Sequence, residues 1–88
     1  MKHIAVLVIY RYGSLNIVIH ASKKTGQTAR EHAMAAAIDY LADEVDPGDD
    51  GWTGDLNEDF ETCQNWLKEA EPDAIIEIWD PHVVNADV

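Results

Sequence analysis

Cysteine and basic residues are scarce in this 88-residue chain, and each scarcity excludes a class of protein. The single cysteine, Cys63, cannot form an internal disulfide, so a disulfide-stapled secreted domain is not expected. Only six Lys and Arg residues are present, too few for the basic footprint that direct nucleic-acid binding requires. The apolar run at residues 4–10 is too short to span a membrane. We therefore expect a soluble, cytoplasmic protein without a membrane partner.

Acidic residues are absent from the first third of the chain and abundant in the rest. Residues 1–30 carry five basic residues and no Asp or Glu (+5), whereas residues 31–88 carry 17 carboxylates and one Lys (−16), which together give the net −11. Charge spread only for solubility would not divide in this way, although general or high-salt solubility stays an alternative. The division favours a surface that binds a basic protein or nucleoprotein. The predicted partner-binding residues are Asp43, Glu44, Asp46, Asp49, Asp50, Trp52, Asp55, Glu58, Asp59 and Glu61.

Two short runs rich in β-branched residues, 3–10 and 16–21, predict a pair of strands. Between them, Gly13 and Ser14 fit the centre of a two-residue type II′ hairpin turn. The alternation then places one set of apolar side chains on a common sheet face. This set is Val6, Val8, Tyr10, Ile17 and Ile19.

Two helices are predicted after the hairpin. The first begins at Thr28, where Thr28 and Glu31 match a capping box, and continues to about Val45. The second follows Asp55, an N-cap candidate, and stops before Pro72. A third strand is predicted at residues 73–80.

The predicted fold is a single α+β domain, residues 1–88, with the order β-β-α-α-β. Two antiparallel helices cover one face of a three-stranded sheet. The strand order 2-1-3, with the third strand parallel to the first, is preferred because the first strand is apolar on both faces. The order 1-2-3, fully antiparallel, stays open.

The second sheet face is predicted to stay uncovered, because no segment is left to cover it. Contiguous exposed apolar surface is typical of an interface, so this face is predicted to bind a second copy in a homodimer, or a partner. The residues assigned to it are Ala5, Leu7, Ile9, Val18, Ile75 and Trp79.

No motif for catalysis or metal binding stands out. Residues 46–57 can be laid on a calcium-binding EF-hand loop, but Gly48 stands where an Asp or Asn should ligate, and Asn57 stands where a bidentate Glu is required. Calcium binding by this acidic loop is therefore only a third hypothesis, and neither a zinc site nor another cofactor is predicted. Cys63 falls on a helical apolar stripe, which indicates a buried structural thiol and not a reactive one. Since no catalytic motif is found, we do not expect an enzyme.

The order of elements resembles small acidic proteins of phages and mobile elements. The resemblance lies in YRYGSLNIVIHASKKTGQTAREHAMAAAIDYLADE, DPGDDGWTGD and AIIEIW. That group includes anti-CRISPR and anti-restriction proteins, some of which mimic DNA. The resemblance implies a non-enzymatic inhibitor in the host cytoplasm, whose acidic helix–loop surface occupies a basic, nucleic-acid-binding surface of a defence complex. The resemblance assigns no functional role to a specific residue of this chain. The basic N-terminal third also differs from the most DNA-like members, which are acidic throughout. A small structural or regulatory module that dimerises through its sheet face is the alternative.

Overall fold

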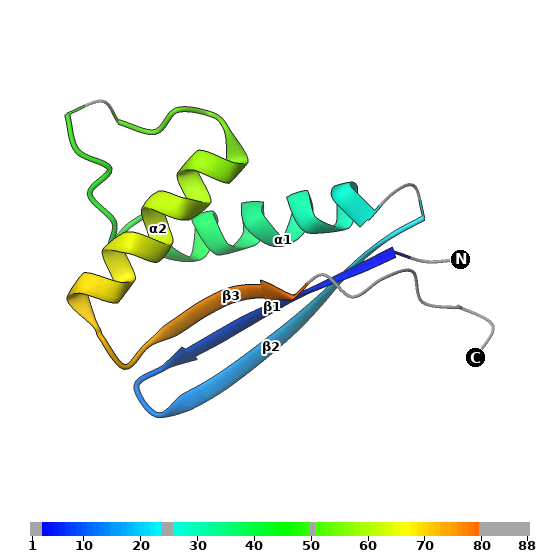
Figure 1. The fold of residues 1–88 in the computed structure, drawn as a ribbon, viewed down its shortest axis with the longest axis horizontal. Helices are drawn as coiled ribbons and strands as arrows, with labels where there is room; N and C mark the ends of the chain where they lie inside the picture. Colours follow the sequence, from blue (N-terminus) through cyan, green and yellow to red (C-terminus); the bar gives the residue numbers. More distant parts are fainter. Residues whose placement is uncertain (1–2, 24–25, 50, 80–88) are drawn as a thin grey trace.

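The computed structural model describes residues 3–23, 26–49 and 51–79. In chain order the elements are β1 (His3–Arg11), β2 (Ser14–Ser22), α1 (Gly26–Leu41), α2 (Leu56–Ala70) and β3 (Ile75–Trp79). The strands form one sheet in the order β2-β1-β3, and both helices lie on one side of it (Figure 1). The predicted α+β class and strand order are confirmed. Among the described helices, none has the length and apolarity needed to cross a membrane.

The β1–β2 hairpin closes through Tyr12 and Gly13, so the predicted Gly13–Ser14 turn is wrong. Tyr12 has φ 55° and Gly13 has φ 77°, and positive φ at both central positions is typical of a type I′ turn. This backbone region is unfavourable for a bulky residue such as tyrosine. The Tyr12 ring gains a compensating contact, because the Arg11 guanidinium lies 4.7 Å from its centroid.

The observed turn slides the hairpin register by two residues relative to the prediction. Tyr10 pairs with Leu15, and Val8 pairs with Ile17. A slide of two residues leaves each side chain on the same face, because side chains alternate with a period of two. The predicted composition of the two faces is therefore confirmed for the hairpin strands β1 and β2.

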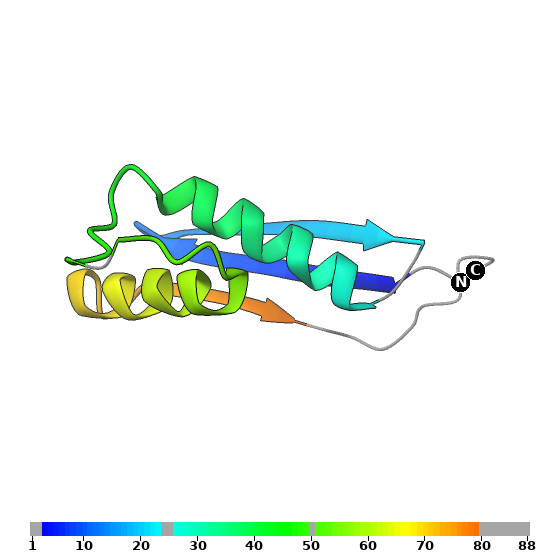
Figure 2. The ribbon, with the colours of Figure 1, turned by 90° about the horizontal axis from the view of Figure 1, so that it is seen from above.

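β3 runs antiparallel to β1, so the predicted parallel orientation is wrong. The relative direction of the two helices also differs from the prediction. Figures 1 and 2 show that α1 and α2 run in the same general direction, not antiparallel. The 15-residue α2 is about 22 Å long at 1.5 Å per residue, and the connection at residues 42–55 is long enough to span that distance. The chain therefore turns back before α2 begins, and β3 leaves α2 antiparallel to β1.

The helices cover the face of β1 that was predicted to stay open. Ala5, Leu7 and Ile9 are buried, in one cluster with residues of both helices. Their assignment to a self-association face is therefore wrong. Both faces of β1 are apolar, so the alternation alone could not say which face the helices cover. Small residues contribute to the observed choice, because Ala5 shares the cluster with alanines of α1 that allow close approach.

The remaining residues of the predicted self-association face divide between the two sides of the sheet. Val18 pairs with Leu7, which places it on the helix side of the edge strand β2. Ile75 pairs with Tyr10 and Trp79 pairs with Val6, so Ile75 and Trp79 lie on the uncovered face as predicted.

The ends of the helices agree with the sequence at α2 but not at α1. α1 begins at Gly26, before Thr28, so Thr28 is not its N-cap. It ends at Leu41, although the Val45 N–H still donates to the Leu41 carbonyl at 2.9 Å. At α2 the prediction is confirmed, because the Asp55 carboxylate accepts from the first-turn backbone N–H groups.

Candidate functional site

The predicted partner-binding residues lie on the helix side of the molecule, along residues 42–55 and the first turns of α2. Figure 1 shows this connection above the helix layer, with the sheet below it. Within the described part of the chain, all of these residues are exposed except Asp59, which is 6% exposed. Asp50 lies outside the described residues. The structure therefore brings the acidic side chains to one side of the fold, but several of them have internal roles.

Glu44 is one of these, because it binds the buried side chain of Arg11 at the end of β1. Arg11 Nη1 and Nη2 donate to the two carboxylate oxygens of Glu44 at 2.8 and 2.6 Å, a bidentate pair. Arg11 Nε donates at 3.0 Å to both carboxylate oxygens of Glu71, the C-cap of α2. Tyr12 and Tyr40 flank the guanidinium, with ring centroids 4.7 and 5.9 Å away. These five residues form what we call the Arg11 cluster.

The Arg11 cluster is electrostatically matched to the helix ends. Glu44 lies just after α1 and Glu71 caps α2, so the guanidinium sits near the C-terminal ends of both helices, where a cation is favoured. Hydrogen bonds from Arg11 lower the pKa of the Glu44 and Glu71 carboxyls below the ordinary value. The hydrogen bonds to Glu44 and then Glu71 raise the pKa of Arg11, which stays charged. Because one side chain binds residues that follow both helices, the two helices must end at the same end of β1.

Asp59, on the first turns of α2, holds the end of the acidic connection. Its carboxylate accepts from the Thr53 N–H at 2.9 Å, the Thr53 hydroxyl at 3.0 Å and the Gly54 N–H at 3.1 Å. These bonds, led by the Thr53 N–H, lower the pKa of the Asp59 carboxyl. Asp59 is thus a structural residue, and its assignment to the exposed partner-binding surface is wrong.

Replacing Asp59 by asparagine is expected to loosen the connection. An amide keeps one acceptor oxygen, but its NH₂ would face backbone donors. We expect faster hydrogen exchange at the Thr53 and Gly54 amides and a lower urea midpoint, measured against the exposed neighbour variant Glu58→Gln. Since the pKa of Asp59 is lowered on folding, its contribution is present above its ordinary pKa of 3.8 and is lost as the pH falls through the lowered value. Unchanged amide exchange in the variant would contradict this role.

Two further acidic residues act locally. Asp46 accepts from the Gly48 N–H at 2.9 Å, which closes a turn at the start of the connection. Asp55 accepts from the N–H groups of Asn57 and Glu58 as the N-cap of α2. Four predicted members have no hydrogen bond or ion pair from their carboxylates to any described residue. These exposed carboxylates are Asp43, Asp49, Glu58 and Glu61.

Trp52 lies among these carboxylates and contributes to a shallow hollow against α1. Trp52 is 38% exposed, and the hollow is also lined by the apolar side chains of Ile38 and Leu56 and by Asp39 and Asp59. The indole therefore anchors the connection to the helices and leaves part of its ring open to solvent. A partner could place an aliphatic group in the hollow while its charged group meets carboxylates.

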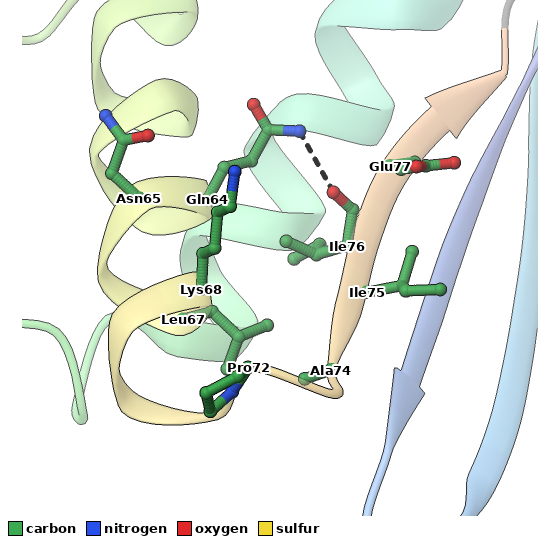
Figure 3. A pocket seen from close by; sticks show the side chains of 9 residues that line it. All are labelled: Gln64, Asn65, Leu67, Lys68, Pro72, Ala74, Ile75, Ile76 and Glu77. Carbon is green, nitrogen blue, oxygen red and sulfur yellow. Dashed lines mark hydrogen bonds between the residues drawn. The ribbon is translucent and has the colours of Figure 1, made fainter.

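A second hollow lies between α2 and β3, and its lining includes a side chain that stabilises the fold. Figure 3 shows the Gln64 amide directed at the edge of β3, where its Nε2 donates to the Ile76 carbonyl at 2.9 Å. The same view shows Ile76 on the side of α2 and Ile75 on the other side of the strand. Gln64 thus satisfies a backbone acceptor at the outer edge of the sheet. Lys68 also lines this hollow, and nothing there pairs a nucleophile with a base.

Cys63 and the acidic connection do not form a reactive or metal-binding group in the described chain. Cys63 is fully buried, and desolvation raises the pKa of its thiol to about 11. In residues 3–23, 26–49 and 51–79, no cluster of three or more His, Cys, Asp or Glu side chains could hold a metal ion. The buried position predicted for Cys63 is confirmed.

The Arg11 cluster was not found from the sequence, although one signal was present. Arg11 continues the alternation of Ala5, Leu7 and Ile9, so it had to point to the same side as they do. A basic side chain on a core face needs carboxylate partners, and this chain has many. The sequence could not say which of them would reach Arg11.

Comparison of the chain with protein-family models, with curated proteins and with solved structures gave no match. The site geometry is therefore the basis for a functional proposal.

Proposed function

We propose that this protein is a non-enzymatic binding protein whose acidic helix–loop surface occupies a basic, nucleic-acid-binding surface of another protein. In this role it acts as an inhibitor of the anti-CRISPR type, as its resemblance to small acidic phage proteins implies. The binding surface consists of the exposed carboxylates and the adjacent Trp52. Its members are Asp39, Asp43, Asp49, Trp52, Glu58 and Glu61.

The observation that carries the proposal is the distribution of charge after internal pairing. Arg11, the basic residue that ends β1, is 5% exposed and neutralised by Glu44 and Glu71. It therefore offers little positive potential to the surface. Within the described chain, the carboxylates of Asp43, Asp49 and Glu58 have no intramolecular partner. Carboxylates of this kind can compete with phosphates for Lys and Arg side chains of a partner.

The hollow at Trp52 supplies what a purely ionic surface lacks. Exposed ion pairs contribute little each, whereas a partly buried aromatic ring can act as an anchor. Lys and Arg carry aliphatic stems that pack on apolar surface while their charged ends stay in water. The combination of Trp52, Ile38 and nearby carboxylates thus fits a basic side chain better than carboxylates alone would.

The proposal is tested by competition on guide-RNA-loaded CRISPR effector complexes, with a fluorescent target DNA duplex as the probe. We expect the protein to displace the duplex from a susceptible complex, with an affinity that falls steeply as salt is raised. The double variant Asp43→Asn/Asp49→Asn is expected to bind about fivefold to tenfold more weakly, because each exposed charge contributes a fraction of a kcal/mol.

The matched control is Glu69→Gln/Asp73→Asn, which removes the same charge from exposed positions near the end of α2. Equal losses in the two double variants would show that net charge alone matters, and would contradict a defined surface. The proposed function would be refuted if the protein displaced DNA from none of the complexes. It would also be refuted if the displacement did not change with salt concentration.

A further inference from the structure

The sheet has one face that no described element covers. Figure 1 shows both helices on the same side of the three strands and the other side without any helix. Large apolar side chains lie on this open face, and each has an exposed fraction of more than one third. They are Tyr10, Leu15, Ile17, Ile19, Ile75 and Trp79.

The area of this open face is large for so small a protein. Six such side chains expose on the order of 600 Å², at the upper limit of the largest apolar patch on typical monomers. Two copies placed face to face would remove on the order of 1,200 Å² from water, which is the lower bound for stable specific interfaces. The open face is thus just sufficient for a weak, specific dimer.

Charge decides which occupant suits this face. β1 and β2 contain no Asp or Glu, and the one carboxylate of β3, Glu77, accepts from the Trp79 indole N–H at 3.1 Å. A basic partner would be attracted to the acidic helix side, not here. A second copy, which also carries −11, is repelled by the helix side and can approach closely through the sheet side.

We propose that two copies of this chain associate through their open sheet faces, with the acidic helix sides directed outward. Facing sheets pack about 10 Å apart with interdigitated side chains. Leu15, Ile17 and Ile19 of β2 meet the same face of the second copy, and Trp79 fills the interface from β3. The resulting dimer would present two acidic surfaces, and its formation does not depend on what they bind.

The test is sedimentation equilibrium from micromolar to near-millimolar protein, at low and at high salt. We expect a reversible dimer that becomes tighter as salt is raised, because salt screens the repulsion between two anionic copies. Binding of a basic partner to the acidic surface has the opposite salt dependence. The two proposals can therefore fail independently.

Adjacent positions on β2 provide a matched pair of variants. Ile17 is 53% exposed on the open face, and Val18 is 46% exposed on the helix side. We expect Ile17→Lys to weaken the dimer about 100-fold, because a charge replaces a central apolar contact on each copy. Val18→Lys changes the same net charge on the same strand and should leave the dimer within about threefold.

Folding of each variant is checked by its circular dichroism spectrum and urea midpoint. Nuclear Overhauser contacts between differently labelled copies provide a second measurement, with intermolecular contacts expected from the Ile17 and Ile19 methyls. A protein that stays monomeric at all concentrations overturns the proposal. So does equal weakening by both lysine variants, which would indicate pairing through the edge of β2 or through another surface.

Discussion

Replacing Arg11 by methionine is expected to lower the free energy of unfolding by about 3 kcal/mol, measured by urea denaturation at pH 7. Arg11 is 5% exposed and joins the ends of both helices to β1 through Glu44 and Glu71. Without it, two carboxylates face one another with no cation between them. We take the low end of the range for breaking a buried ion pair, because the Glu44 side chain is 40% exposed and can rehydrate. The loss is a large fraction of the stability of so small a domain.

The pH dependence of the Arg11→Met variant separates loss of the ion pairs from loss of packing. The folded-state pKa values of Glu44 and Glu71 are lowered, so their contribution is fully present above about pH 4.5, their ordinary pKa. It disappears as the pH falls through the lowered values. We therefore expect the difference between wild type and variant to be greatest near neutrality and to shrink below pH 4.5.

The matched control for this effect is Arg11→Met combined with Glu44→Gln and Glu71→Gln, which removes the repulsion along with the cation. It should recover part of the lost stability, and its difference in stability from the Glu44→Gln/Glu71→Gln double variant should not depend on pH in this range. A single Arg11→Met variant as stable as the wild type would show that the cluster does not stabilise the fold.

Replacing Leu7 by alanine is expected to cost about 3 kcal/mol, because Leu7 is 3% exposed in the centre of the helix-covered face. The same change at Leu15, which is 59% exposed on the open face, should cost less than about 1 kcal/mol in dilute, monomeric protein. The comparison uses one chemical change at two positions and is read from urea midpoints. Equal costs at Leu7 and Leu15, or a larger one at Leu15, would mean that the helices cover the other face.

The local features of the fold were predictable because they depend on neighbouring residues. Alternation in residues 3–10 and 16–21 determined which side chains share a face, even though the turn was placed one residue too late. Asp55 was recognisable as an N-cap because the helical stripe starts directly after it. Cys63 was recognisable as buried from its position on that stripe, and Phe60 and Leu67 of α2 are buried with it.

The turn position and the start of α1 were local errors, whereas the larger errors concern choices that depend on distant residues. Nothing local to β1 distinguishes its two apolar faces, and the choice is made by the helices and by the partners of Arg11. The direction of α2 follows from how residues 42–55 cross the helix layer, and Asp59 helps to fix that path. Both determinants include polar contacts of a charged side chain, which a pattern of apolar residues does not contain. The candidate site was therefore predicted as a region, while the separation of its structural and exposed carboxylates required coordinates.

The separation of charge between the two sides of the fold also affects how the protein moves toward another molecule. Acidic side chains crowd the helix side, while the hairpin below carries none. Such a molecule has a permanent electric dipole along the direction from the helix side to the sheet side, in which it extends 30 Å. In the field of a basic surface it would rotate during diffusion and arrive with the acidic connection foremost. Productive encounters would then be frequent even for a small and weakly held interface.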